Sequence, residues 1–340
     1  MIKPMTVIIP TANRPVFLET ALESVARQSA SHNIEEIIVS ENLGNRESEE
    51  VCHKFKNLPI RYLFQDPILT NVQNIHFLMQ QAKSELVAFL CDDDWWSTGH
   101  LDTAITSLSK NLDASAFFSG CLFTESEAAS SGFVYPRLPL WLASGKPKYS
   151  SQWILTMPSI FAISWIWTSF HLSTMVARRE ALMKASEVLL DSHPYYTDRI
   201  LYPHLSMHGS IIYDPFIDTF IRAHQGNYYR DKRKEDLDKH HAEGSKKIFE
   251  LGASLNLDLV GEWRRYFSEI PSEQHDDLLD VFRYALSAVG LEDYGFQEFV
   301  HAPLSEFKKS PMTIKSLLRA ITPPVMASTY RKVVSTRKQH

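Results

Sequence analysis

The feature that most limits the possible folds is an apolar run that ends in acidic residues. Residues 86–90 (Leu-Val-Ala-Phe-Leu) are all apolar, and Asp92, Asp93 and Asp94 follow after Cys91. Such a run is typical of a strand covered on both faces. Adjacent carboxylates repel, and each raises the pKa of its neighbour unless a cation offsets the charge. A divalent ion such as Mg²⁺ or Mn²⁺, shared with substrate phosphates, would provide that charge. The alternative is a solvated acidic loop that caps the next helix.

Further apolar runs alternate with segments of helical periodicity. We predict strands at 5–10, 37–39, 60–64 and 86–90. Helices are predicted between them at 16–28, from after residue 42 to about residue 56, and at 71–82. This alternation indicates an α/β fold, a mostly parallel, Rossmann-like sheet flanked by helices. Ligands bind such sheets at the carboxyl ends of the strands. After about residue 227 the chain becomes charged, and amphipathic patterns at 239–251 and 276–289 predict a C-terminal helical extension.

Composition excludes several classes of protein. An apolar content of 44% with 22% charged residues is ordinary for a globular chain, and the net charge of −5 argues against a nucleic-acid partner. The three cysteines have no metal-type spacing and fit a reducing compartment, so we expect a cytoplasmic location. The apolar run at the N-terminus is too short for a signal peptide.

The stretch 149–177 contains no Asp, Glu, Lys or Arg and includes Trp153, Trp165 and Trp167. Its length would permit a transmembrane helix. Pro158 and His171 interrupt it, together with several Ser and Thr residues. These interruptions favour a buried segment beside an aromatic-lined cleft.

Several ordered motifs resemble those of one enzyme family. They are PTANRP at 10–15, IIVSEN at 37–42, VAFLCDDDWW at 87–96, MVARREAL at 175–182, the block 197–209 and IRAHQGN at 221–227. In this order they are similar to the motifs of the inverting family-2 glycosyltransferases, which have the GT-A fold. The resemblance covers about residues 4–230. It implies a GT-A catalytic domain at 1–228, followed by a helical region at 229–340.

The resemblance implies a role for individual residues. Asp93 would be the main ligand of Mn²⁺ or Mg²⁺, supported by Asp94, and His224 would reach the metal or the diphosphate. Asp92 would contact the donor ribose. The remaining donor-binding residues would be Thr11, Asn13 and Arg14 on the first loop and Glu41 at the nucleobase. Asp198 would be the general base. Cys91 stands where other members can have Asp, so the alignment of the three aspartates with the family motif, and the roles that follow from it, can shift by one residue.

The implied reaction transfers a sugar from a nucleotide-diphosphate donor to a hydroxyl of a glycan or lipid-linked acceptor, with inversion, in bacterial surface polysaccharide synthesis. The alternatives are a metal-dependent nucleotidyltransferase or nucleotide-sugar hydrolase, and a non-catalytic binding protein on the same scaffold. The chain departs from the family pattern at Ala12, Glu41, Thr197 and His204. These departures concern the donor more than the reaction.

The C-terminal tail differs in charge from the rest of the chain. Residues 305–340 contain eight Lys or Arg and one acidic residue, Glu306. Ile314, Leu317, Leu318 and Ile321 fall on one helical face. A basic amphipathic helix suits an anionic membrane surface, so we predict peripheral contact with the inner face of the membrane. The alternative is an ordinary helix packed on the acidic body.

Overall fold

One mixed sheet organises the part of the chain that the computed structural model describes, residues 4–126, 129–135, 152–166, 168, 170–194, 196–224 and 234–269. The strands are β1 (Met5–Thr11), β2 (Ile34–Glu41), β3 (Ile60–Phe64), β4 (Leu86–Phe89), β5 (Trp95–Trp96), β6 (Ala114–Ser126), β7 (Ala129–Tyr135), β8 (Trp153–Leu155), β9 (Val176–Arg178) and β10 (Ser210–Arg222). The α-helices are α1 (Pro15–Ala26), α2 (Glu47–Lys54), α3 (Asn71–Gln81), α4 (His100–Lys110), α6 (Met157–Ile166), α7 (Arg179–Ser186), α8 (Thr197–Ser206), α9 (Lys234–Ser254) and α10 (Leu259–Glu269). Short 3₁₀ turns are η1 (Ser31–Asn33), η2 (Leu172–Thr174) and η3 (Glu187–Asp191).

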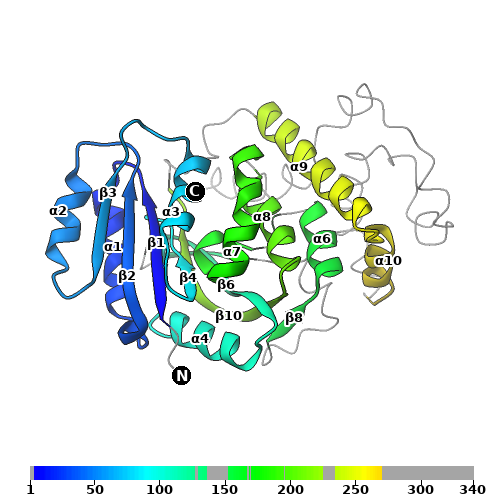
Figure 1. Ribbon diagram of the computed structural model, residues 1–340, viewed down its shortest axis with the longest axis horizontal. Helices are drawn as coiled ribbons and strands as arrows, with labels where there is room; N and C mark the ends of the chain where they lie inside the picture. The colour runs from blue at the N-terminus through cyan, green and yellow to red at the C-terminus, as the bar shows by residue number, and fades with distance from the viewer. Residues whose placement is uncertain are drawn as a thin grey trace, which may run out of the picture.

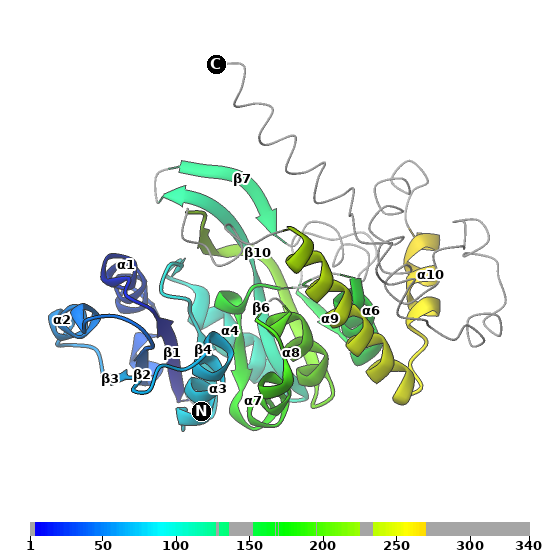
Figure 2. The same ribbon diagram turned by 90° about the horizontal axis from the view of Figure 1, so that it is seen from above.

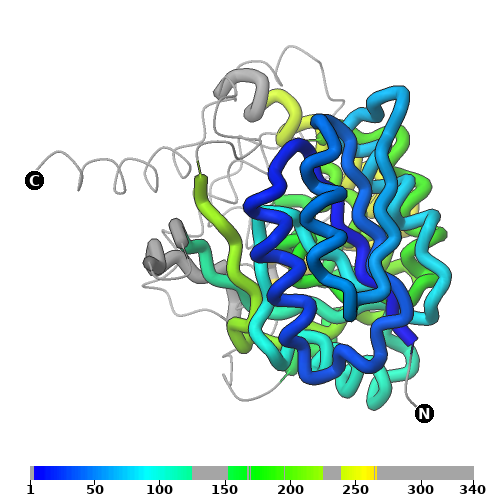
Figure 3. The backbone as a smooth tube through the Cα atoms, turned by 90° about the vertical axis from the view of Figure 1, so that its left-hand side faces the viewer, coloured from blue at the N-terminus to red at the C-terminus, as the bar shows by residue number. Residues whose placement is uncertain are grey.

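The strands lie in the order β3-β2-β1-β4-β9-β6-β10-β5, with β7 paired to β6 and β8 paired to β10 (Figure 1). The first four of these strands are parallel. The short strand β9 runs antiparallel between β4 and β6, whereas β6 and β10 are parallel to each other. A parallel N-terminal half is therefore joined through β9 to a mixed C-terminal half. Figure 3 views the N-terminal half, in blue, from the outer edge of the sheet.

Helices cover both faces of the sheet because successive strand side chains point to opposite sides. Ile8, Val87 and Phe89 lie in one apolar cluster with α3, α6, α7 and α8. Their sequence neighbours Val7 and Ala88 lie in a second cluster with α1, α2 and α4. The continuous apolar runs in the sequence thus reflect strands buried from both sides, as Figure 2 shows from above.

The predicted N-terminal elements are confirmed, with small shifts at their ends. The strand predicted at 60–64 has the same limits as β3, and the helix predicted at 71–82 is α3. That helix begins with a capping box in which Thr70 and Gln73 bond each other's backbone N–H groups. The helix predicted at 239–251 lies within α9. The segments 225–227, 276–289 and 305–340 lie outside the described residues.

Part of the uncharged stretch 149–177 forms β8 and α6. Every side chain from Ser159 to Ile166 is buried in α6, where the helix contacts α8, α9 and α10. The prediction of a buried segment therefore holds for α6. Among the described residues, no helix is long and apolar enough to cross a membrane.

Candidate active site

The predicted site lies where β1 and β4 end side by side. These strands are parallel neighbours, with Ile8 paired to Phe89, so the loop after β1 reaches the turn after β4. The Thr11 hydroxyl donates a 2.7 Å hydrogen bond to Asp92 Oδ2. Arg14 Nη1 lies 3.3 Å from Asp92 Oδ1 and 3.0 Å from Asp93 Oδ2. The sheet thus brings together two motifs that lie about eighty residues apart in the chain.

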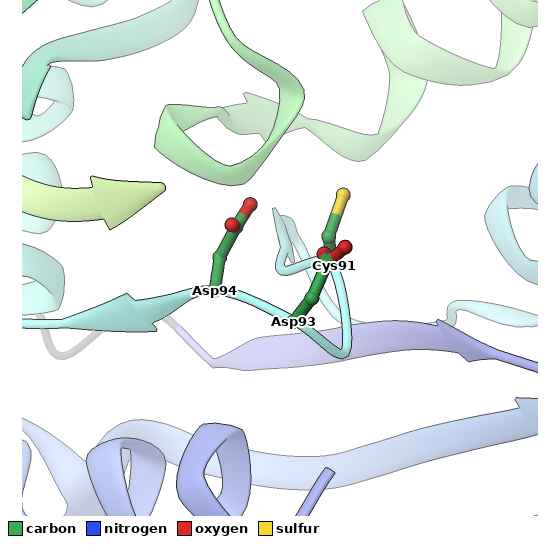
Figure 4. A group of neighbouring side chains, drawn as sticks. All are labelled: Cys91, Asp93 and Asp94. Carbon is green, nitrogen blue, oxygen red and sulfur yellow. The ribbon is translucent and has the colours of Figure 1, made fainter. Parts of the chain in front are cut away.

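A tight turn sorts the side chains that follow β4. The backbone N–H of Asp94 donates to the carbonyl oxygen of Cys91 at 3.2 Å, which closes a turn over Asp92 and Asp93. Asp92 faces Thr11 and Arg14. The Cys91 sulfur and one oxygen each of Asp93 and Asp94 lie within 4.8 Å of one another (Figure 4). The turn therefore directs one carboxylate to the first loop and separates it from a three-residue group.

The three-residue group is held from the C-terminal half of the sheet. Ser173 in η2 donates a 2.5 Å hydrogen bond to Asp94 Oδ2, and its hydroxyl accepts one from the Cys91 N–H at 3.0 Å. The backbone N–H of Arg222, at the end of β10, donates to Asp94 Oδ1 at 3.1 Å. The Arg222 side chain donates from Nε to the Asp93 carbonyl at 3.1 Å. The pairing of β5 with β10 brings these groups together.

Aromatic rings frame the same end of β10. The Arg222 guanidinium lies over the rings of Phe17 and Trp95, 4.9 Å and 4.7 Å from their centroids. The His224 ring lies 4.8 Å from that of Phe17, and its Nε2 is 3.0 Å from Asp93 Oδ2. α1 and the end of β10 thus enclose Asp93 from two sides.

The three aspartates differ in their electrostatics. Burial and the neighbouring Asp93 raise the pKa of Asp92 to about 7, against the opposing charge of Arg14. Burial also acts to raise the pKa of Asp93, but the hydrogen bond from His224 and the charge of Arg14 lower it below its usual value. Burial and Asp93 raise the pKa of Asp94 well above its usual value. His171 Nδ1 lies 3.7 Å from Asp94, but burial lowers the pKa of that imidazole to about 4, so it is neutral near pH 7.

The donor set of this group fits a divalent cation. Two carboxylates and a sulfur converge from one turn. Asp94 is buried and receives its hydrogen bonds from two neutral donors, a hydroxyl and a backbone N–H. A buried carboxylate placed so close to Asp93 is expensive to ionise without a further positive charge. Asp93 and Asp94, the predicted metal ligands, both belong to this group, together with Cys91. His224 contacts Asp93 from outside this group.

The predicted nucleobase residue, Glu41, lies at the end of β2 and is completely buried. Its carboxylate accepts hydrogen bonds from Ser48 at 3.0 Å and from the Tyr62 hydroxyl. A Cβ atom at Gly44 would lie 2.5 Å from Glu41 Oε1 and 3.2 Å from Asn13 Cβ, so a larger residue there would have to displace the Glu41 carboxylate. Gly44 also has a φ of +140°, which favours glycine. Gly44 therefore lies against both Glu41 and Asn13, the residue before Arg14.

Asp198, the predicted general base, lies in the first turn of α8. It accepts a 2.8 Å hydrogen bond from the backbone N–H of Arg199, and burial raises its pKa to about 6. In the described part of the chain, no hydrogen bond joins it to the aspartate triplet. α8 ends at Ser206 and β10 begins at Ser210, so Asp198 lies at the end of α8 that is farther from the start of β10. Asp198 is thus the one predicted site residue that the described contacts do not tie to the others.

Sequence reasoning missed several residues of the site. Ser173 and His171 come from the uncharged stretch, which was interpreted only by its hydropathy. Arg222 belongs to a motif but has no predicted role, and Cys91 enters the sequence prediction only as a position where other members can have Asp. The short run of polar residues at 171–174, placed just before a strand, was the available signal for Ser173.

Known proteins share part of this sequence and the overall fold. Residues 6–123 match the family described as Glycosyl transferase family 2. None of the curated proteins matches the sequence. Staphylococcus aureus TarS, residues 1–349 in complex with UDP-GlcNAc, is 15% identical with a TM-score of 0.55, over 84% of this chain and 81% of that one. The mannosyltransferase PcManGT from Pyrobaculum calidifontis, in complex with GDP-Man and Mn²⁺, is 15% identical with a TM-score of 0.50, over 86% and 87%.

These matches confirm the predicted GT-A fold and the predicted resemblance. The family match covers the motifs from the first loop to the aspartate triplet. The structural matches extend the shared fold over most of the chain.

Proposed function

We propose that the protein, whose residues 6–123 match the family described as Glycosyl transferase family 2, is a metal-dependent inverting transferase that moves a sugar from a nucleoside-diphosphate donor to an acceptor hydroxyl. The proposal rests on one observation: the turn after β4 directs its side chains into two separate groups. Asp92 faces the first loop, and Cys91, Asp93 and Asp94 form a group that can hold a cation. Both lie at the carboxyl edge of parallel strands, where α/β sheets bind nucleotides.

The residues of the first loop would bind the donor. Arg14 carries a positive charge beside Asp92 and Asp93, at the place proposed for the diphosphate. Glu41, held by Ser48 and Tyr62 behind Gly44, would fix the shape of the loop that faces the nucleobase. We propose that Thr11, Asn13, Arg14, Glu41 and Asp92 are the donor-binding residues.

The reaction needs the leaving diphosphate stabilised and the acceptor activated. Asp93, Asp94 and their neighbours would hold a divalent cation, which would supply Lewis acidity where negative charge develops on the leaving group. His224 can add a hydrogen bond on the same side, since its Nε2 already contacts Asp93. Asp198 takes the proton of the acceptor hydroxyl. With one base and attack opposite the leaving group, the anomeric centre inverts.

The location and acceptor are also part of the proposal. None of the three cysteines forms a disulfide bond, which fits a reducing, cytoplasmic compartment. We propose a glycan or lipid-linked acceptor in bacterial surface polysaccharide synthesis, reached from the inner face of the membrane. The basic tail 305–340 supports membrane docking by its charge.

A panel of nucleotide sugars tests the proposal. The purified protein is incubated with UDP-, GDP-, CDP- and dTDP-sugars, with a divalent ion and simple glycan acceptors, and release of nucleoside diphosphate is measured. We expect release from one donor to depend on the acceptor, and NMR of the product should show the inverted anomer. Acceptor-independent release would indicate a hydrolase, and a retained anomer would contradict the role of a single base.

A further inference from the structure

The group formed by Cys91, Asp93 and Asp94 mixes a thiol with two carboxylates. We propose that Cys91 binds the cation of the donor site as a thiolate, so that the site prefers a thiophilic divalent ion such as Co²⁺ or Zn²⁺ over Mg²⁺. The inference rests on the proposed function, because it assigns a ligand to the cation of that same site. It concerns a residue that neither the family match nor the structural neighbours assign.

The distances permit a single ion to bind all three side chains. The three ligand atoms lie within 4.8 Å of one another. Metal–sulfur bonds are about 2.3 Å and metal–oxygen bonds about 2.0–2.2 Å, so two ligands of one ion are separated by roughly 4.5 Å at most. A shift of a few tenths of an ångström in the side chains, within reach of their rotation, would bring all three ligand atoms within bonding distance of one ion.

The backbone holds the sulfur on the correct side of the turn. The hydrogen bond from the Asp94 N–H to the Cys91 carbonyl fixes the first and fourth residues of the turn. Ser173 then links them again, because its hydroxyl accepts from the Cys91 N–H and donates to Asp94 Oδ2. Figure 4 shows all three side chains on the same side of the ribbon. Asp92 is directed instead to Thr11 and Arg14, which leaves Cys91 as the third member of the group.

Ligand chemistry decides the preferred ion. Carboxylate oxygens suit Mg²⁺ and Mn²⁺, whereas thiolates select softer ions, and affinity rises along the divalent series from Mn²⁺ towards Cu²⁺. On coordination the Cys91 S–H bond breaks, the sulfur gives its electron pair to the metal, and the proton leaves to water. No oxidant or reductant is required. A mixed sulfur and oxygen set should therefore distinguish Co²⁺ from Mg²⁺ more strongly than carboxylates alone.

Cobalt absorption provides a direct test. The full-length protein, kept reduced with a phosphine because thiol reductants bind cobalt, is titrated with CoCl₂. We expect a sulfur-to-cobalt charge-transfer band in the near ultraviolet that saturates at one ion per chain. Cys91→Ser should lose the band and weaken Co²⁺ binding at least about tenfold, a loss that even an outer-shell partner can cause. Cys52→Ser and Cys121→Ser, which remove the other two thiols, should keep the band.

A second variant measures ion preference. Cys91→Asp replaces the sulfur by oxygen, so the ratio of Mg²⁺ to Co²⁺ dissociation constants should fall at least about tenfold relative to wild type. An unchanged ratio would overturn the inference. So would cobalt binding to the wild type without a charge-transfer band, a band that survives in Cys91→Ser, or no cobalt binding at all. The wild-type spectrum decides even if a variant fails to fold.

The outcomes separate this inference from the proposed function. Sugar transfer by a protein whose cobalt complex has no sulfur band would leave the transferase standing and remove the thiolate. A sulfur band in a protein that binds no nucleotide sugar would keep Cys91 as a metal ligand and contradict the proposed function.

Discussion

At the scale of single residues, Asp92, Asp93 and Asp94 are consecutive but have different neighbours. Asp92 accepts a hydrogen bond from the Thr11 hydroxyl, and Asp94 accepts one from the Ser173 hydroxyl. Asp93 lies between Arg14 and His224. The sequence predicted the triplet and its first-loop partners because both follow apolar strands that must lie in one sheet. It could not predict Ser173, because a serine in an uncharged stretch carries no local signal of its partner.

Asp198 is the residue whose role is most easily isolated by mutation. We expect Asp198→Asn to leave donor affinity nearly unchanged and to lower kcat by about 10²-fold or more, because a general base acts only in the transition state. Donor binding is measured by calorimetry and turnover by diphosphate release. Asp191→Asn, an exposed carboxylate nearby in η3, should have near-normal kcat. A near-normal kcat in Asp198→Asn would transfer the role to another carboxylate.

The same carboxylate predicts the acid limb of the pH profile. Burial raises the pKa of Asp198 to about 6, so the carboxyl is protonated, and unable to accept a proton, below that pH. We expect kcat at saturating donor to be level above about pH 7 and to fall towards tenfold per pH unit well below 6. The profile is measured at saturating metal. An acid limb near pH 4, the usual range of an exposed carboxyl, would contradict the assignment.

At the scale of elements, local patterns predicted β1 to β4 and α1 to α3, since buried parallel strands are continuous apolar runs. The mixed half was not predicted. β9 has only three residues, and β5 has two, so neither offers a pattern of useful length. β10 contains Asp214 and Pro215 at a register shift, which breaks its alternation. The placement of Arg222 and Ser173 depends on these pairings, which join distant segments.

Arg199 anchors α8 and hence the first turn that carries Asp198. It is 1% exposed, and it donates to the carbonyl oxygens of Ser164 at 2.6 Å and His241 at 3.0 Å. Further hydrogen bonds go to the Trp165 carbonyl and the Ser245 hydroxyl. We expect Arg199→Ala to lower the free energy of unfolding by about 3 kcal/mol, because several buried acceptors lose a charged donor.

Denaturant unfolding measures this effect, with Arg199→Lys as an intermediate case that keeps the charge. Lys184→Ala, which removes an exposed ion pair with Glu180, should change stability by less than about 1 kcal/mol. Equal stability of Arg199→Ala and wild type would show that the contacts between α6, α8 and α9 do not depend on this side chain.

At the scale of the whole molecule, the helices after residue 229 pack on the sheet domain. Ile248 in α9 is fully buried, and Trp263 in α10 donates to the Ala162 carbonyl in α6 at 2.9 Å. α6 is therefore covered by the C-terminal helices, which explains why so apolar a helix stays within the protein. The proposed boundary at 228/229 separates a proposed catalytic domain from a helical region. α9 and α10 nevertheless share a core with α6.

The tail 305–340 stays a prediction. We expect the full-length protein to sediment with anionic liposomes at low salt and to be released at high salt, because each Lys or Arg near the surface contributes about 1 kcal/mol. Replacing Lys308, Lys309, Lys315 and Arg319 by Gln should weaken binding roughly 10²- to 10³-fold by the same figure. A truncation at residue 304 should stay in the supernatant. If all three proteins remain in the supernatant at low salt, the tail does not dock on membranes.

Metal-dependent binding of the donor tests the central claim most directly. Calorimetric titration of the wild type with its preferred nucleotide sugar, in Mn²⁺ or Co²⁺, should show binding that is abolished by excess chelator and by Asp93→Asn. Asp102→Asn, an exposed carboxylate on α4, should bind like wild type. Circular dichroism should show that Asp93→Asn keeps its fold. Donor affinity that is the same in chelator as in metal, or unchanged in Asp93→Asn, would contradict the assignment of this turn as a metal and nucleotide-sugar site.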